Sequence, residues 1–472
     1  MHKSLTKIGV GQLTLTFGFE PKDETEETED NGPAASSSVP AVGCRTERKF
    51  KWHSLIDKVY ALPNLQKAWD RVRSNRGAAG ADGMTVKRFA DQAEERILAL
   101  HDDLRNKTYR PQPVRRVVIP KSGGGTRPLG IPNVRDRIVQ QALLQVLEPI
   151  FEEIFSDRSH GFRRGRGSAT ALDVVDRAIR HGYTWVVDAD IEKFFDTVDH
   201  EKLLSAVNER VADGSVLRLI RQILTAGVVL PDVSSTEPTE LGTPQGGPIS
   251  PLLANIYLHA FDVQMAASGY GLVRYADDFV IFAKSEGEAL EALTLAREIL
   301  EGEMGLRLHP EKTRVVSVAA GFEFLGFHYF HDPKTGLSCK EVRRKSVANF
   351  RQSIRERTPR LHAQRAVKRK HLTIRRLRNN KRVQAMLESL NAYLRGWYWY
   401  FKTMRGRYER PFETFDGFTR RRIRSAIVGR VGSGWWNIQL NNTFMRDIGY
   451  RGVEDLDKLY RQGLLTAPVR KD

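Results

Sequence analysis

Residues 271–284 read GLVRYADDFVIFAK, and this stretch decides how the chain folds. Two apolar runs flank the YADD sequence at 275–278, which predicts a β-hairpin with carboxylates at its tip. A second strand-like run, YTWVVDADI at 183–191, ends in Asp188 and Asp190. Because apolar strands bury their flanks, we expect both sets of acids at the rim of one sheet, where ligands collect.

Carboxylates brought together at such a rim repel one another unless cations neutralise them. Hard oxygen ligands suit Mg²⁺, which keeps bound water and shares substrate phosphates. Two such ions about 3.5–4 Å apart form a clamp for in-line phosphoryl displacement. For Asp277 and Asp278 taken alone a plain turn is an equal alternative, because Asp favours turns.

Similar reasoning places other elements along the chain. Val114–Pro120 and Leu129–Ile131 predict a second hairpin around a glycine-rich turn at Gly123–Gly125. The run FEFLGFHYF at 322–330 is also typical of a strand. Helical spacing of apolar residues predicts helices at 56–69 (with Pro63 as a break), 90–104, 135–155, 200–225, 250–268, 287–304 and from about 345 onward.

Charge is distributed very unevenly. The chain has 75 Lys and Arg against 57 Asp and Glu, a net charge of +18. Residues 340–430 hold 27 basic and 6 acidic residues, so this segment carries the whole basic excess. Such a segment usually faces a polyanion, most often nucleic acid, and the alternative is a solvated face.

Composition excludes several classes of protein. The 472 residues suffice for two to four domains, and no apolar run approaches the roughly 18–20 residues of a membrane helix. Two cysteines cannot build a disulfide scaffold or a four-cysteine zinc site. Residues 20–30 hold seven acids and lead into a Pro- and Ser-rich stretch, which predicts a disordered tether over about 20–45.

Many motifs in a fixed order resemble those of bacterial group II intron reverse transcriptases, over roughly residues 52–450. They are KSGGGTRPLGIPNVRDRIVQ (121–140), HGFRRGRG (160–167), DIEKFFDTVDH (190–200), GTPQGGPISPLLANIYL (242–258), YADD (275–278), FLGF (324–327) and LRGWYWYFK (394–402). The resemblance implies an α/β + α fold: a right-hand polymerase with fingers and palm, followed by an α-helical thumb or maturase domain. It also implies RNA-directed DNA synthesis from a primer 3′-OH and dNTPs.

The resemblance assigns the metal site residue by residue. Asp190, Asp277 and Asp278 match the catalytic acids that bind two Mg²⁺ ions. Asp188 shares a strand face with Asp190 without matching a motif position, so we take it as a supporting acid. In FLGF, the resemblance implies a turn that seats the primer end.

The nucleotide site also follows from the resemblance. Phe195 falls where these enzymes keep a bulky side chain against the sugar, and a ring there collides with a ribose 2′-OH. Its alternative, a core phenylalanine, suits Phe194 better. The remaining residues expected to contact or support the nucleotide are Lys121, Arg127, Gln245, Gly246, Gly247 and Lys312.

In the basic segment, an apolar stripe of helical spacing indicates a buried helix face. Its members are Met386, Leu390, Tyr393, Leu394, Trp397 and Phe401. This leaves other faces for RNA or DNA, as in the family thumb. The expected nucleic-acid contacts are Arg375, Arg376, Arg378, Lys381, Arg395 and Lys402. Aromatic patches such as Trp435-Trp436 are better explained as core than as stacking platforms.

We therefore expect an N-terminal extension (1–50), fingers and palm (51–335), a basic helical domain (336–450) and a tail (451–472). Expected partners are an RNA template, a DNA primer, dNTPs, intron RNA and target DNA. Without a leader or membrane segment, we expect a cytoplasmic, bacterial protein that associates with the nucleoid. No His-Asn-His nuclease motif follows residue 450, so second-strand cleavage is not expected. The alternatives are a non-catalytic maturase that assists splicing and a reverse transcriptase recruited to defence or repair.

Overall fold

The computed structural model describes residues 51–120, 126–229, 236–237, 241–243, 246–361, 373–404, 412–428 and 440–465. The chain divides into two units, Met1–Phe50 and Lys51–Asp472, each of which contacts mainly itself. The tether expected over about 20–45 lies outside the described residues. None of the described helices is long and apolar enough to cross a membrane.

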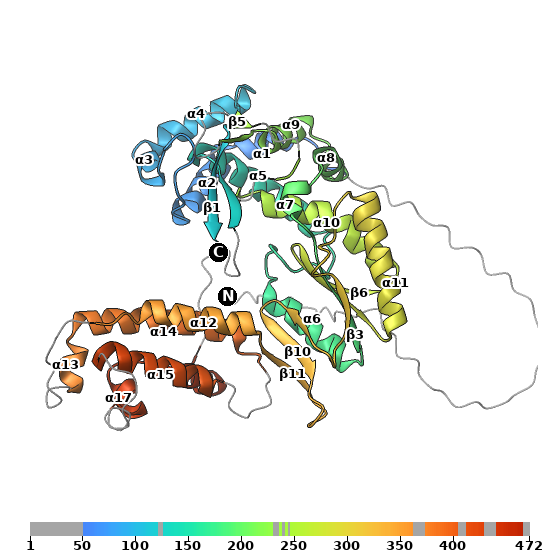
Figure 1. Cartoon of the computed structure of the whole chain (residues 1–472). Coiled ribbons are helices and arrows are strands. Elements are labelled where there is room, and N and C mark those ends of the chain that lie inside the picture. The colour runs from blue at the N-terminus through green and yellow to red at the C-terminus, as the bar shows by residue number, and fades with distance from the viewer. Residues whose placement is uncertain are drawn as a thin grey trace, which may run out of the picture. The chain divides into compact units, whose positions relative to one another are not determined.

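A four-stranded antiparallel sheet carries the acids (Figure 1). Asp190, the last residue of its strand, pairs with Asp278 across the sheet, and Asp278 pairs with Tyr275 across the hairpin. The predicted hairpin and the predicted acidic strand are therefore confirmed, and their acids meet at one end of the sheet. In spatial order the strands are β6 (Gly271–Tyr275), β7 (Asp278–Ala283), β3 (Trp185–Asp190) and β8 (Arg314–Ser317).

The two faces of this sheet pack against different elements, because successive side chains of a strand point to opposite faces. Val187 and Ile281 join the main core together with α10 (Ser250–Ala267) and α11 (Glu286–Arg297), which continues as the π-helix Glu298–Glu303. The neighbouring residue Phe282 packs edge-on against Phe322 of another sheet.

That second sheet has three antiparallel strands, β9 (Phe322–Phe324), β10 (Phe327–His331) and β11 (Ser338–Val342). The single strand predicted over 322–330 is thus two strands joined at Leu325 and Gly326. Lys340 of β11 is buried and forms an ion pair with Asp176 of α6 (Ser168–Arg180), with 2.9 Å between Nζ and Oδ2. This sheet continues past residue 335, where we placed the end of the palm.

The first part of the described chain combines helices with a second hairpin. Strands β1 (Val114–Pro120) and β2 (Thr126–Ile131) pair as predicted, and β1 also pairs in parallel with β4 (Val228–Val229). Strand β5 (Thr236–Glu237) pairs with β4. The helices of this part are α1 (Ile56–Tyr60), α2 (Leu62–Ser74), α3 (Val86–Ala90), α4 (Ala93–Arg105), α5 (Val134–Glu152), α7 (Phe194–Thr197), α8 (His200–Asn208) and α9 (Gly214–Leu224).

Two predicted helices are each divided in two. The helix expected at 56–69 breaks at Ala61, and Pro63 lies in the first turn of α2, where a proline costs no hydrogen bond. The helix expected at 200–225 is interrupted before α9. There the carboxylate of Asp213 accepts hydrogen bonds from the amides of Ser215 and Val216, which makes Asp213 a strong helix cap.

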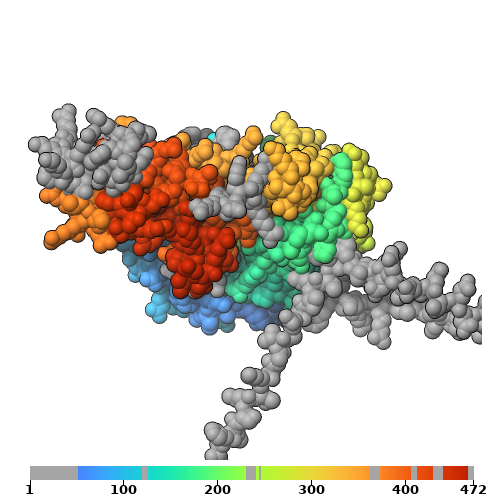
Figure 2. All heavy atoms as spheres, turned by 90° about the horizontal axis from the view of Figure 1, so that it is seen from below, coloured from blue at the N-terminus to red at the C-terminus, as the bar shows by residue number. Residues whose placement is uncertain are grey.

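The basic segment forms the helices α12 (Arg344–Arg357), α13 (Ile374–Arg378), α14 (Lys381–Phe401), α15 (Glu413–Val428), α17 (Asn442–Asp447) and α18 (Val453–Arg461). The predicted stripe of α14 is buried, except for a half-buried Tyr393. Helix α15 contacts α12, and α18 contacts both α14 and α15. In Figure 2 these C-terminal helices, in orange to red, lie next to one another on the visible face. Helix α18 lies in the segment 451–472 that we expected to be a tail. Trp435-Trp436 lies outside the described residues.

Candidate active site

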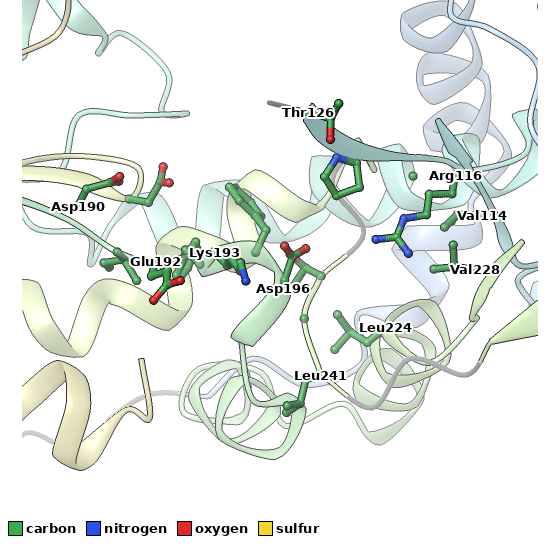
Figure 3. Close-up of a pocket in the computed structure, with 18 of the residues that line it drawn as sticks. Val114, Arg116, Thr126, Asp190, Glu192, Lys193, Asp196, Leu224, Val228 and Leu241 are labelled. Atoms are coloured by element: carbon green, nitrogen blue, oxygen red, sulfur yellow. The ribbon is translucent and has the colours of Figure 1, made fainter. Parts of the chain in front are cut away.

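A cavity of about 730 Å³ borders the acidic end of the four-stranded sheet. Asp190 and Asp277 line one side, and the opposite side is formed by β1 and β2. In Figure 3, Asp190 and Arg116 lie at opposite ends of the cavity, with Lys193 and Asp196 between them. The cavity therefore extends from Asp190 and Asp277 to the guanidinium of Arg116.

Backbone hydrogen bonds hold the acidic strand end and the hairpin tip together. The amide of Ile191 donates to the carbonyl of Asp277 over 3.3 Å, and the amide of His309 donates to the carbonyl of Asp190 over 2.8 Å. The adjacent Ala276 has φ +59°, a left-handed conformation that non-glycine residues rarely adopt. The tip is thus a constrained turn whose two acids project from defined backbone positions.

The acids of this cluster differ in their pKa shifts and in their ion-pair partners. Burial, reinforced by Asp190, Asp188 and Asp277, raises the pKa of Asp278 to about 8. Lys312 forms an ion pair with Asp190, and Arg314 forms one with Asp188 over 2.9 Å. Burial of Asp188 still raises its pKa, because desolvation outweighs the hydrogen bonds from Arg314.

Within the described part of the chain, no three His, Cys, Asp or Glu side chains gather tightly enough to hold a metal ion as they stand. The ammonium of Lys312 donates a hydrogen bond to Oδ2 of Asp190 instead. The negative charge concentrated around Asp278 nevertheless fits a divalent cation, since oxygen ligands of this type suit Mg²⁺.

A buried ion pair supports the hairpin from behind. Arg274 and Asp262 have no exposed side-chain surface, and the guanidinium of Arg274 bonds both carboxylate oxygens of Asp262. The same guanidinium donates to the carbonyl of Ala276 over 3.0 Å and to Ser159 Oγ over 2.8 Å. Gly161 lies so close that a Cβ on it would come within 2.6 Å of the Ala276 amide nitrogen. The sequence reading missed Arg274, although a charged residue inside an apolar strand was its signal.

The two phenylalanines after Asp190 separate as predicted. Phe194 is 1% exposed and belongs to the core, whereas Phe195 is half-buried; both line the cavity. The carbonyl of Phe195 accepts a hydrogen bond from the Thr243 amide over 2.7 Å. Gly242 packs so closely that a Cβ there would lie 2.7 Å from the Phe195 carbonyl oxygen. Gly242 and Thr243 therefore hold the backbone of Phe195 in place.

Other expected nucleotide contacts are described only in part. Gly246 has φ +121° and approaches the carbonyl of Gly130 in β2, so a side chain there would be strained. Gly247 lies beside the buried side chain of Gln140. Lys121 and Gln245 lie outside the described residues, and Arg127 is described only as a backbone position in β2.

Arg116 is a cavity residue that the sequence reading missed. It lies on β1, is half-buried and presents its guanidinium to the cavity in Figure 3. Its signal was the period of a strand, which places Arg116 on the same face as the cavity residue Val114 and turns Arg115 to the other face. A guanidinium suits the bidentate recognition of phosphate.

Comparison with known proteins identifies this architecture. Residues 119–329 match the family model "Reverse transcriptase (RNA-dependent DNA polymerase)", and residues 363–439 match "Group II intron, maturase-specific domain". Protein YkfC of Escherichia coli is 37% identical over 326 residues, which cover 61% of this chain and 85% of YkfC. The chain belongs to the group II intron family of reverse transcriptases.

Two further proteins are similar to parts of this reverse transcriptase. Group II intron-encoded protein LtrA of Lactococcus lactis is 41% identical over 196 residues, which cover 41% of the chain and about a third (32%) of LtrA. Among solved structures, a chain of a partial Cas6-RT-Cas1–Cas2 complex is 26% identical with a TM-score of 0.35, covering 52% of this chain and 43% of that one.

The basic side chains expected to bind nucleic acid fall into two groups: those that are exposed and those that already contact other parts of the protein. Arg375, Arg376, Lys381 and Arg395 are exposed on α13 and α14. Arg378 is also exposed, but its Nε donates to the carbonyl of Asp447. Lys402 is half-buried, and its Nζ lies 4.1 Å from the Trp399 ring centroid and 4.2 Å from that of Tyr460. In this structure Lys402 therefore joins α14 to α18.

Proposed function

We propose that this reverse transcriptase extends a primer 3′-OH with dNTPs on an RNA template in the cavity between the acids and β1. The 3′-oxygen attacks the α-phosphorus of the dNTP, and pyrophosphate leaves. The observation that carries this proposal is the meeting of Asp190, at the end of β3, and Asp277, in the turn between β6 and β7, at the edge of a cavity that Arg116 also lines.

Reverse transcriptase domains use divalent metal ions, and we propose two Mg²⁺ ions held by Asp190, Asp277 and Asp278. Such ions supply the charge neutralisation that an in-line displacement requires. Lys312 bonds Oδ2 of Asp190, so this oxygen becomes available to a metal ion when Lys312 leaves, and the released ammonium can then meet a phosphate oxygen. This exchange gives Lys312 a role in nucleotide binding that agrees with its place beside the cavity.

For the triphosphate we add Arg116 to the residues proposed from the sequence, Lys121 and Arg127. Gln245 and Gly246 stay our proposal for support of the nucleotide and the template base. We also propose that a domain boundary lies near residue 342, where β11 ends, with the fingers and palm before it and the basic helical domain after it.

Replacing the ring of Phe195 should open the site to ribonucleotides. We expect Phe195→Val to reduce the preference for dNTPs over rNTPs by about 10- to 100-fold, because the steric barrier to a 2′-OH disappears. Single-nucleotide incorporation with each substrate measures the ratio of kcat/KM values. The incorporation of dNTPs by the variant is the internal control, and an unchanged ratio would assign Phe195 to packing alone.

We further propose that the exposed arginines of α13 bind RNA backbone, including that of an intron. The double change Arg375→Gln/Arg376→Gln should weaken RNA binding and lower the slope of log K against log salt by about 2. Fluorescence anisotropy at several salt concentrations measures both. The matched control, Lys87→Gln/Arg88→Gln on α3, removes the same charge from other exposed positions, and an equal effect there would mean general charge attraction.

The deciding experiment is primer extension by the purified chain on a primed RNA template with four dNTPs. We expect cDNA with Mg²⁺ and none with a chelator. Absence of cDNA together with tight, salt-sensitive RNA binding would favour the alternative of a non-catalytic maturase that assists splicing. A group II intron enclosing the reading frame would support mobility, and its absence would support a role in defence or repair.

A further inference from the structure

The turn between β9 and β10 has an unusual backbone. Phe324 pairs directly with Phe327, so only Leu325 and Gly326 connect the two strands. Both have positive φ angles, +45° and +84°, which is the pattern of a type I′ turn. Glycine adopts this conformation freely, but leucine does not. The turn therefore needs contacts from outside the hairpin to stay in one conformation.

Helix α14 supplies those contacts through two neighbouring side chains, Tyr400 and Phe401. The hydroxyl of Tyr400 donates to the carbonyl of Leu325 over 2.9 Å. Its ring stacks on Phe327 with 6.2 Å between centroids and 13° between planes. A Cβ on Gly326 would lie 3.6 Å from Cε1 of Tyr400, so the ring also limits this position. From the other side, the amide of Arg343 donates to the carbonyl of Gly326 over 3.0 Å.

This clamp lies beside the catalytic acids. Strand β9, which leads into the turn, contacts β3, the strand that carries Asp188 and Asp190. Burial raises the pKa of Tyr400, and Asp278 is among the charges that raise it further. Glu323, two residues before Leu325, likewise raises the pKa of Asp188. Yet the Tyr400 side chain is 40% exposed, so part of the ring faces solvent at this place.

We propose that Tyr400 is a positioning residue for the primer terminus: by clamping the Leu325–Gly326 turn it sets the surface against which the last primer nucleotide lies. This inference rests on the proposed polymerase function, because a primer 3′-OH must then come up to the acids that the turn borders. Through Tyr400, the position of α14 is coupled to the position of the primer end.

Tyr400→Phe tests this, because it removes the hydroxyl and keeps the stacked ring. Loss of the hydroxyl's bond to the Leu325 carbonyl, together with its interaction with Ser168, should raise the KM for primer–template about five-fold. The KM for dNTP should stay within two-fold, since the turn does not line the nucleotide cavity. The matched control is Tyr398→Phe on the same helix, whose hydroxyl donates to Asp457 of α18 over 3.1 Å, within the helical domain. It should leave the KM for primer–template unchanged.

Two readouts without turnover separate this proposal from the polymerase proposal. A 2-aminopurine at the primer 3′ end reports how that base is held, and hydrogen exchange reports the opening of residues 322–331. We expect Tyr400→Phe, but not Tyr398→Phe, to raise the fluorescence of the bound primer end and to speed exchange. If the wild-type chain makes no cDNA, these two readouts still decide the role of Tyr400. A loss of thermal stability with unchanged primer KM, fluorescence and exchange would reduce Tyr400 to a packing residue.

Discussion

Asp277→Asn should abolish cDNA synthesis, with a loss of more than about 1000-fold in kcat. An amide has the size of the carboxylate but lacks its negative charge, so it can no longer help to neutralise divalent ions at the cavity edge. The fold should survive, because the backbone contact of this residue is made by its carbonyl group, which the substitution keeps. Extension of a labelled primer on RNA measures the effect.

RNA affinity provides the control within the same variant, since binding by the exposed arginines should persist. Asp173→Asn, which changes an exposed acid on α6, should leave synthesis unchanged. Full activity of Asp277→Asn would place the chemistry elsewhere. An inactive wild-type chain would instead mean that the acids no longer serve a polymerase.

Arg274→Met should destabilise the protein by about 3–5 kcal/mol, because it leaves the carboxylate of Asp262 buried without a cationic partner. The left-handed turn at Ala276 would also lose the guanidinium that bonds its carbonyl. Urea unfolding followed by circular dichroism measures the free energy of unfolding.

A second variant keeps this prediction open to refutation. Arg274→Met/Asp262→Leu removes both charges and should recover most of the lost stability, while activity stays low because the turn is no longer held. Arg221→Met breaks an exposed ion pair with Glu201 and should give no resolvable change. If Arg274→Met unfolds like wild type, water or another group compensates the buried carboxylate.

The placement of the acids was predictable, because each lies at the end of an apolar strand and strand ends are a local signal. The contrast between Phe194 and Phe195 followed instead from the resemblance of the DIEKFFDTVDH stretch to the family motif. The partners of these residues were not predictable. Lys312 meets Asp190 across 122 positions and Arg274 meets Ser159 across 115, and such pairs depend on the folded topology alone.

The basic segment teaches a related lesson. Its charge predicted a nucleic-acid surface, but charge density does not tell which cations are already engaged. Lys402 lies between two aromatic rings, and Arg378 bonds a carbonyl group, because both lie where α14 or α13 meets the C-terminal helices. The exposed side chains of Arg375, Arg376, Lys381 and Arg395 are therefore the better choice for mutagenesis.

The strand order has a consequence for how the protein is made. Strand β3 lies between β7 and β8, so both of its hydrogen-bonded neighbours are synthesised much later than β3 itself. At ordinary rates of translation, about 5–20 residues per second, Asp190 leaves the ribosome several seconds before Asp278. During that time β3 has two open edges, which are sites for misassembly. A nascent chain that stops before residue 277 contains Asp190, one of the three proposed catalytic acids, and neither neighbour of the strand that carries it.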